Sequence, residues 1–577
     1  MGVGFGAEAI RFAARLPPGL PMIAAGFDGC VAGLEAAVER RRAGTPFYAA
    51  PLVDDPRALI AQRLAGNWIQ TLTDIDDRYA AFDALAADRL ADAGIEISAD
   101  ELAVIDDPER RVLRDFAIMG DALLVRSTRE AERVARVLKR HRPAVIVAPG
   151  EDPAVPFLTA INGDAIVVWA PYAAADRLGV IAMALEYMHS RVIYVCASGQ
   201  LAFVRGTFVD PTHADAALTA ASCIVDASIG DPAGAIALRR IGVPIVAAST
   251  AGVSEFMDGA LEYDPWDWRT IFAAVAAARG AHPPVLKHRP ATLQELTSTL
   301  ERVATPAALT EPLVSVVVLT YNRRELLRCA LDSIARQHYR KIELIVVNNG
   351  GIDIADIVAD YGPAHVMNLT DNILPNAALD LGFEACQGKY FCVLSDDDEY
   401  FPDHLARLVD ALETSNAEVG HSNTLTRYLS LANGRRETVA YRVRSDRPAD
   451  KLQILVGGTM AFHSMLFRRD VRALLGGLQI DVAPADYEYT LRAAQRFDFV
   501  HVDSVTCEWN YAIEGTSYTH RDNMYDGLKC IYEEYPSNGS RIVEQRRLAE
   551  LERFSERNSG KALWPPDLLL ARSRPNA

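Results

Sequence analysis

The sequence predicts an α/β protein built from two Rossmann-like regions in series. Short apolar, β-branched runs alternate with helix-length segments in both halves of the chain, a pattern typical of mostly parallel sheets covered on both faces. At 577 residues the chain is also too long for one hydrophobic core, which favours about two to four domains.

The composition is that of a soluble globular protein, with 50% hydrophobic and 23% charged residues. A formal net charge of −17 opposes general affinity for nucleic acid, so no such partner is expected. The sequence contains no run of about 20 apolar residues and no signal-peptide core. Eight scattered cysteines without a Cys-x-x-Cys pair favour buried free thiols in a reducing compartment. We expect a cytoplasmic protein; peripheral contact with the inner face of the membrane stays open.

The first half carries a series of expected strands separated by helix-length segments. These strands are 144–149, 165–170, 191–196, 223–228 and 244–249. A proline-rich break then follows at 282–290, and Thr292 with Glu295 fits the capping box of a short helix. The second region opens with a buried strand at 313–322, a helix and a strand at 342–349, which predicts a right-handed βαβ unit.

Five segments follow from this pattern. They are a partial N-terminal region (1–110), a Rossmann domain (111–285), a linker with a short helix (286–311), a second α/β domain (312–535), and a C-terminal helix and tail (536–577). The charged C-terminal helix could mediate association or pack on its own domain, so the oligomeric state stays open.

The sharpest local feature is the acidic run Ser395-Asp396-Asp397-Asp398, which follows the expected strand KYFCVL. Ligands of open α/β sheets bind at the carboxyl ends of strands. Mg²⁺ or Mn²⁺ prefers carboxylate oxygens and commonly links them to substrate phosphates. The alternative is a solvated acidic turn.

The acidic run belongs to a longer ordered set of blocks. In chain order these blocks are Thr320-Tyr321-Asn322, Asn348-Asn349, Asn376, Asp396-Asp397-Asp398 and Pro402-Asp403-His404-Leu405. The set closely resembles the family 2 glycosyltransferases, which have the GT-A fold.

The resemblance implies roles for these residues. Asp397 and Asp398 would hold Mn²⁺ or Mg²⁺, with Asp397 the best ligand. The nucleotide-sugar donor, expected to be a UDP-sugar, would contact Thr320, Tyr321, Asn322, Asn349, Asn376 and Asp396. Two departures matter: Asn348-Asn349 replaces the usual Asp, which leaves the nucleotide preference open, and Ser395 stands where Asp often begins the motif.

The segment 457–497 resembles the acceptor-side block of the family, and places the catalytic base at Asp486, with Ala485 instead of the usual Glu. A helix N-cap is the other reading of Asp486, and both can hold together. In the segment 506–520, His520 could reach the metal, or could be an exposed loop histidine.

The segment 213–256 resembles the nucleotide-sugar half of a GT-B, family 4-type glycosyltransferase. The matching turns are Asp231-Pro232-Ala233-Gly234, 242–246 and 252–255. The acid spacing fails, because Asp231 replaces the first Glu and Arg239 occupies the position of the second. We therefore expect a divergent, inactive GT-B-like module that binds acceptor or partners.

These patterns predict an inverting glycosyltransferase that acts on a glycan, a lipid-linked glycan or a protein, in surface glycan assembly or protein glycosylation. Two alternatives remain. The chain could be bifunctional, with an active GT-B-type site in its first half, or a non-catalytic nucleotide-binding scaffold.

Overall fold

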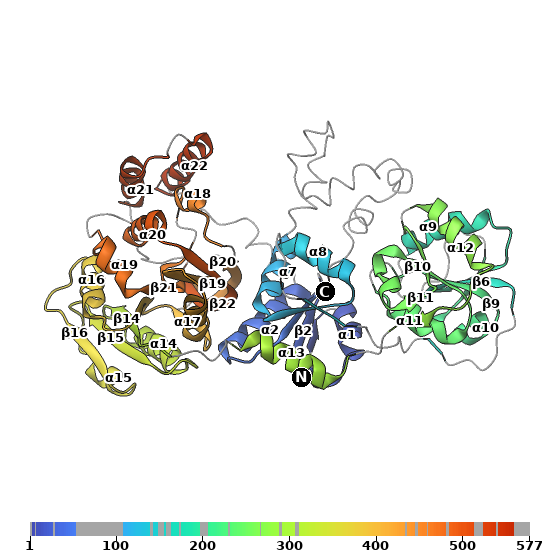
Figure 1. The fold of residues 1–577 in the computed structure, drawn as a ribbon, viewed down its shortest axis with the longest axis horizontal. Helices are drawn as coiled ribbons and strands as arrows, with labels where there is room; N and C mark the ends of the chain where they lie inside the picture. Colours follow the sequence, from blue (N-terminus) through green and yellow to red (C-terminus); the bar gives the residue numbers. More distant parts are fainter. Residues whose placement is uncertain are drawn as a thin grey trace. The chain divides into compact units, whose positions relative to one another are not determined.

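The computed structural model describes residues 3–558 with gaps (Figure 1). The gaps are 6, 27–28, 53–107, 139–141, 143, 148–154, 157–162, 172–174, 197–205, 229–230, 266, 288–290, 306–310, 433–434, 445–447, 458–459, 480–483, 513–522 and 538–539. The chain divides into two compact units. We call Met1–Leu34 with Phe47–Val303 the N-terminal unit, and Glu35–Pro46 with Ala304–Ala577 the C-terminal unit.

The N-terminal unit contains a five-stranded parallel sheet in the order β1-β2-β3-β4-β5. Its strands are β1 (Val3–Phe5), β2 (Met22–Ala25), β3 (Tyr48–Pro51), β4 (Ala122–Val125) and β5 (Ala144–Ile146). Its helices are α1 (Ala7–Ala14), α2 (Cys30–Arg42), α7 (Pro108–Met119) and α8 (Thr128–Leu138).

The helix expected in the linker forms as α13 (Leu293–Ala304), and Thr292 and Glu295 make the expected capping box. Leu296 and Leu300 on this helix are buried in the core of the five-stranded sheet, beside Phe12. The segment 286–311 therefore supplies a core helix of the N-terminal unit as well as a connection.

A second, six-stranded parallel sheet has the order β12-β10-β9-β6-β7-β8. Its strands are β6 (Ala165–Ala170), β7 (Val192–Cys196), β8 (Thr207–Val209), β9 (Ala221–Asp226), β10 (Ile245–Ala248) and β12 (Leu261–Tyr263). Numbered from β6, the order is 3-2-1-4-5-6, that of a doubly wound Rossmann sheet. The other elements are α9 (Ala175–Glu186), α10 (Ala214–Thr219), α11 (Ala233–Leu238), α12 (Trp268–Ala278) and the hairpin of β11 (Met257–Asp258) with β13 (Val285–Leu286).

The five strands expected in the first half all form, but they divide between the two sheets. The segment expected at 144–149 forms β5 in the first sheet, whereas the other four lie in the second sheet. The first sheet therefore extends beyond residue 110, the boundary that the sequence suggested.

The C-terminal unit is built on a nine-stranded mixed sheet in the order β16-β15-β14-β17-β21-β19-β22-β18, with β20 paired to β19. Its strands are β14 (Val314–Thr320), β15 (Ile342–Asn348), β16 (Ala364–Asn368), β17 (Tyr390–Ser395), β18 (Glu399–Tyr400), β19 (Val419–Ala432), β20 (Arg435–Arg444), β21 (Met465–Arg468) and β22 (Phe499–Ala512). The first four strands are parallel, as the expected βαβ unit requires.

Helices pack on both faces of this sheet. The helices of the unit are α14 (Arg324–Ala335), α15 (Ala355–Ala359), α16 (Pro375–Ala385), α17 (His404–Thr414), α18 (Lys451–Ile454), α19 (Arg469–Leu475), α20 (Ala485–Arg496), α21 (Asn523–Glu534) and α22 (Arg541–Asn558). Leu327 and Leu331 of α14 bury their side chains against Val316 and Val318 on one face, at the spacing of an amphipathic helix. The opposite face packs on α16, where a Cβ at Gly382 would lie 2.5 Å from Val317.

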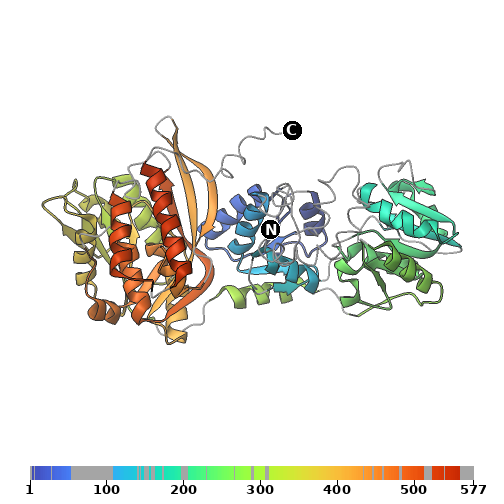
Figure 2. The same ribbon diagram turned by 90° about the horizontal axis from the view of Figure 1, so that it is seen from above.

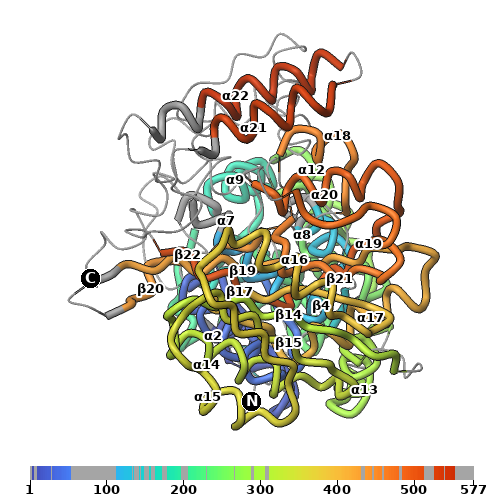
Figure 3. Tube along the Cα trace, turned by 90° about the vertical axis from the view of Figure 1, so that its left-hand side faces the viewer, coloured from blue at the N-terminus to red at the C-terminus, as the bar shows by residue number. Residues whose placement is uncertain are grey.

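Helices α21 and α22 lie side by side (Figure 2 and Figure 3). Leu528 and Ile531 of α21 pack against Tyr487 and Leu491 of α20, and Leu551 of α22 joins the same cluster. The charged C-terminal helix therefore packs on its own unit, one of the two roles that its sequence allowed.

All eight cysteines are free thiols, and Cys329 and Cys530 are the two that are exposed. Within the described residues, no helix is long and apolar enough to cross a membrane.

Candidate active site

The strand order of the C-terminal unit reverses between β14 and β17, which are parallel neighbours with Leu319 paired to Ser395. Such a reversal opens a crevice at the carboxyl ends of the strands, where α/β proteins bind ligands. Thr320 ends β14, and the acidic run Asp396-Asp397-Asp398 follows β17. The fold therefore brings two of the predicted blocks to one edge of the sheet.

Asp396 is buried and held by two donors. Thr320 Oγ1 donates to Asp396 Oδ2 at 2.8 Å, and Arg323 Nη1 donates to Oδ1 at 3.1 Å. Burial and the neighbouring charge of Asp397 raise the pKa of Asp396, while Arg323 opposes that shift. The predicted pair Thr320 and Asp396 is thus in direct contact.

Asp397 is the most accessible of the three acids, with 32% of its side chain exposed against 5% for each neighbour. Arg323 Nη1 also donates to Asp397 Oδ2, at 3.1 Å. One guanidinium therefore bridges the carboxylates of Asp396 and Asp397. Arg323 was not among the residues predicted for the site, although it directly follows the Thr-Tyr-Asn turn.

Asp398 turns into the protein. Its Oδ1 accepts a hydrogen bond from the backbone N–H of Asn510 on β22 at 2.9 Å, and its Oδ2 lies 3.3 Å from Nδ1 of His463. Burial and the charge of Asp397 raise the pKa of Asp398 well above its usual range. Burial lowers the pKa of His463 to about 4, so this histidine is neutral at physiological pH. Among the described residues, Nε2 of His463 has no hydrogen-bond partner.

His463 and Asn510 are two contacts of Asp398 that the sequence analysis did not identify. His463 lies within the acceptor-side block, but nothing in its spacing points to Asp398. Asn510 acts through its backbone, which leaves no signal in the residue type.

The Thr-Tyr-Asn turn is built for a tight reversal. Asn322 has a φ of 57°, in the left-handed region that asparagine tolerates better than most residues. Its Oδ1 accepts a hydrogen bond from the N–H of Ile352 at 2.8 Å, which ties this turn to the loop after β15. Tyr321 is left 43% exposed at the tip.

The asparagines at the end of β15 fasten the surrounding loops. Nδ2 of Asn349 donates to Oδ1 of Asn372 and to the carbonyl of Ile373, both at 2.9 Å. Nδ2 of Asn348 donates to Ile352 O and Asn368 Oδ1. A carboxylate could not donate to these oxygens, which gives a physical reason for Asn where the family usually has Asp.

Exposed apolar side chains surround the asparagines. Tyr321, Ile352, Ile373 and Leu374 are all exposed, on the loops that Asn322 and Asn349 fasten. Asn376 lies in the first turn of α16, directly after these loops, and is half-buried. We call the exposed side chains of Tyr321, Ile352, Ile373 and Leu374 the apolar rim.

Asp486 is the second residue of α20, and the N-cap position is held by Pro484. The N-cap interpretation was therefore wrong. Oδ1 of Asp486 accepts the N–H of Tyr487 at 2.8 Å, and the side chain is exposed. Desolvation by the surrounding protein raises the pKa of the Asp486 carboxyl, and the hydrogen bond from the backbone N–H of Tyr487 opposes that shift.

Helix α20 is fixed to the sheet by aromatic packing. The ring of Tyr489 lies 5.7 Å from that of Phe467 on β21, and Phe467 stacks on Phe391 of β17 at 5.3 Å. Phe391 is four residues before Ser395. One rigid core therefore carries both Asp486 and the acidic run. His520 lies outside the described residues.

Residues 315–475 match the family model described as Glycosyl transferase family 2. These residues form a family 2 glycosyltransferase domain. The matched range contains the acidic run and ends before Asp486.

Two similar proteins are named as glycosyltransferases. The chain is 28% identical over 241 residues to the uncharacterized glycosyltransferase YwdF of Bacillus subtilis, a match that spans 41% of this chain and 85% of that protein. It is 37% identical over 102 residues to the uncharacterized glycosyltransferase RP339 of Rickettsia prowazekii, which spans 18% of this chain and only 32% of that protein. The crystal structure of S. aureus TarS 1–349 with UDP-GlcNAc is 17% identical, with a TM-score of 0.33, and the match covers 43% of this chain and 73% of that chain.

The residues of the family 2 domain fit a divalent cation that protein carboxylates and substrate phosphates hold together. Among the described residues, no group of three or more His, Cys, Asp and Glu side chains is arranged to hold a metal by itself. Mg²⁺ typically takes one or two carboxylates and completes its shell with water and substrate phosphates. The accessible carboxylate of Asp397 matches that requirement.

The acidic turns of the N-terminal unit around Asp231 and Glu255 contact the chain itself. Asp231 Oδ2 accepts from Arg15 at 2.6 Å and lies 3.9 Å from Arg126, while its Oδ1 accepts the N–H of Ala233. Glu255 accepts the N–H and the hydroxyl of Thr128, at the start of α8. These acids are therefore engaged within the unit.

Proposed function

We propose that the chain is an inverting glycosyltransferase that transfers a sugar from a nucleotide diphosphate sugar to an acceptor hydroxyl. The observation that carries this proposal is the accessible Asp397 at the switch point of a family 2 domain, beside Asp396 and the apolar rim.

Asp397 would hold a divalent cation, with Asp398 supporting it from the interior. When bound, such a cation supplies charge neutralisation to a departing diphosphate without proton transfer. Thr320 and Arg323 keep Asp396 in place, and Arg323 adds a positive charge beside the position of the phosphates. Tyr321, Asn322, Asn349 and Asn376 would form the nucleoside side of the donor site.

Asp486 would act as the general base. An acceptor hydroxyl is a weak nucleophile, and a carboxylate with a raised pKa is better matched to take its proton. A base separate from the metal-holding acids supports one direct displacement, which inverts the anomeric configuration.

The donor is proposed as a UDP-sugar, and the acceptor as a glycan, a lipid-linked glycan or a protein, in surface glycan assembly or protein glycosylation. The proposed setting is the cytoplasm, with peripheral membrane contact as an accompanying hypothesis.

The test is a panel of nucleotide sugars incubated with the full chain and Mn²⁺, with released nucleotide as the readout. We expect release from one donor class, loss of release on chelation, and recovery with added Mn²⁺ or Mg²⁺. Release that persists in excess chelator would contradict the metal role. Absence of release from every donor, with glycan, lipid-linked and peptide acceptors present, would contradict the proposed function.

A further inference from the structure

Strand β18 fastens the end of the acidic run, and it is two residues long. Its register partners on β22 are Glu399 with Glu508 and Tyr400 with Cys507. Glu399 directly follows Asp398, and β22 also supplies the N–H of Asn510 that holds Asp398. The position of Asp398 therefore depends on this short antiparallel pairing.

The pairing places two carboxylates directly opposite each other. Like charges at such positions destabilise a sheet. Glu508 is also fully buried, so its charge needs a close partner. A counter-charge is thus a structural requirement of the Asp-rich turn.

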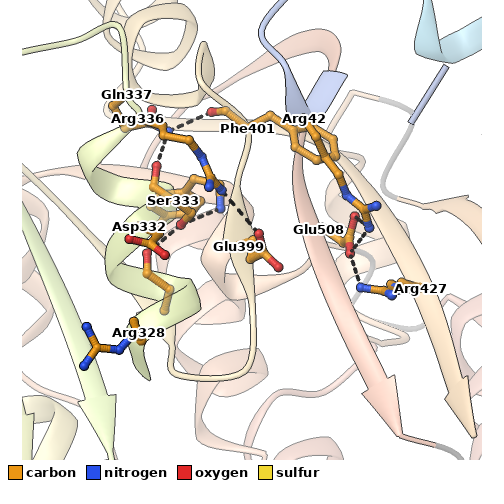
Figure 4. Close-up of polar contacts among 12 residues, drawn as sticks. Arg42, Arg328, Asp332, Ser333, Arg336, Gln337, Glu399, Phe401, Arg427 and Glu508 are labelled. Atoms are coloured by element: carbon orange, nitrogen blue, oxygen red, sulfur yellow. Dashed lines mark hydrogen bonds and ion pairs between the residues drawn. The ribbon is translucent and has the colours of Figure 1, made fainter. Parts of the chain in front are cut away.

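Arg42 supplies most of that counter-charge (Figure 4). Its Nη2 lies 2.9 Å from both carboxylate oxygens of Glu508. Arg427 lies farther from the same carboxylate, at 3.6 Å, and its Nε donates a hydrogen bond to Oγ1 of Thr438. Arg336 stands 3.5 Å from Glu399, in a more exposed pair.

Arg42 comes from a segment far from the family 2 domain in sequence. Helix α2 contributes residues up to Leu34 to the N-terminal unit and residues from Glu35 to the C-terminal unit. Two further contacts anchor this segment: Arg41 donates to Asp403 at 3.4 Å, and Gly44 packs on Pro402, where a Cβ would lie 3.0 Å from the ring. The C-terminal unit is therefore completed by residues 35–46.

We propose that Arg42, which the segment Glu35–Pro46 brings to the C-terminal unit, is a positioning residue for the Asp-rich turn. The proposal rests on the proposed function of that site. Arg42 neutralises Glu508, which lets β18 pair with β22 and keeps Asp398 against Asn510.

The test compares R42M, R42K, E508Q and R42M/E508Q in the full chain. Mn²⁺ affinity is measured without donor by electron paramagnetic resonance, and kcat and KM are measured by nucleotide release. We expect R42M to weaken Mn²⁺ binding and kcat about tenfold, the scale of an unfavourable carboxylate pair joined to a buried charge. R42K should lose less Mn²⁺ affinity and less kcat than R42M, because lysine keeps the positive charge. R42M/E508Q should recover, because the neutral amide at position 508 neither repels Glu399 nor needs a counter-charge.

The direction in which R42M changes Mn²⁺ affinity distinguishes a positioning role of Arg42 from a direct effect of its charge on the metal. An unneutralised Glu508 would by itself attract Mn²⁺ more strongly, so tighter binding by R42M would overturn the proposal. A double variant as impaired as R42M would also overturn it. If R42M does not fold, a double variant R42M/E508Q that folds and turns over supports the proposal. If R42M and R42M/E508Q both fail to fold, the proposal is overturned.

Matched controls lie on the same elements. Glu39 pairs with Arg42 at 2.7 Å on the exposed side, so E39Q tests the helix without touching Glu508. E39Q should have the Mn²⁺ affinity and kcat of the unaltered chain. R427M should lose less Mn²⁺ affinity and less kcat than R42M. A loss in E39Q equal to that in R42M would overturn the proposal. Absence of release by the unaltered chain would contradict the proposed function instead, while the Mn²⁺ measurement would still test the role of Arg42.

Discussion

The two units each place an acid-bearing turn after a strand that pairs with a parallel neighbour, but they use the acids differently. In the N-terminal unit, Asp231 is engaged by Arg15 and Arg126, and Glu255 holds the start of α8. In the C-terminal unit, Asp397 keeps an accessible carboxylate. The comparison teaches that a shared sheet architecture does not make a site, because chemistry needs groups that a ligand can reach. Both acids have an arginine partner, but the side chain of Asp397 is 32% exposed and that of Asp231 is 20% exposed.

The largest expected effect is at Asp486. Asp486→Asn keeps the size of the side chain and removes its basicity, so transfer should fall by about 10²–10⁴-fold, the usual contribution of a general base, while donor binding stays intact. Because the pKa of Asp486 is raised, activity of the unaltered chain should fall with decreasing pH at a higher pH than for an ordinary Asp.

The measurement is kcat/KM against pH, together with nucleotide binding and thermal unfolding. A raised folded pKa means that the ionised carboxyl destabilises the fold above its unfolded pKa, so Asp486→Asn should not lower the unfolding temperature at neutral pH. Retained turnover in this variant would exclude Asp486 as the base.

Asp397→Asn directly tests the comparison between the units. Loss of the accessible carboxylate should reduce transfer by about 10²–10³-fold, as for other single electrostatic groups at reacting phosphates. The matched variant Asp231→Asn should leave transfer unchanged. Sugar transfer that survives Asp397→Asn and disappears in Asp231→Asn would instead place an active site in the N-terminal unit. The readout is nucleotide release with and without added Mn²⁺.

Asn349→Asp examines why this chain departs from the family pattern. The substitution replaces two hydrogen-bond donors with a carboxylate facing Asn372 Oδ1 and Ile373 O. We expect a loss of about 1–3 kcal/mol in unfolding free energy and a raised KM for the donor. Denaturant unfolding and donor titration measure both. Improved donor binding in Asn349→Asp would show that the asparagine costs affinity instead of ordering the loop.

The smallest effect is expected at Glu255. Glu255→Ala removes the acceptor for the first N–H of α8, at a cost of about 1 kcal/mol, the usual value for a lost helix cap. Transfer by the C-terminal unit should not change. A drop in kcat larger than the drop in stability would reveal a functional role for this turn.

Local sequence signals predicted the elements and the outline of the site. The apolar runs became β6, β7, β9 and β10, and the capping box at Thr292 formed. Thr320 and Asp396 met because both end neighbouring parallel strands. The boundary near residue 110 and the sheet that contains β5 could not be read in this way, since both depend on contacts between distant segments. The cap at Asp486 was wrong for a local reason, because the helix begins one residue before Asp486, with Pro484 at the N-cap position.

By itself, the sequence determined an α/β protein with a family 2 glycosyltransferase domain, because strand periodicity and ordered motifs are local properties. Only the tertiary structure decided which acids stay accessible. Asp397 is open while Asp398 turns toward His463 and Asn510, and Asp231 is engaged by Arg15. Only the fold, too, brought Arg42 to Glu508 across 466 positions. The physical reason is that the availability of a charge depends on the partners that folding places beside it, and those partners come from anywhere in the chain.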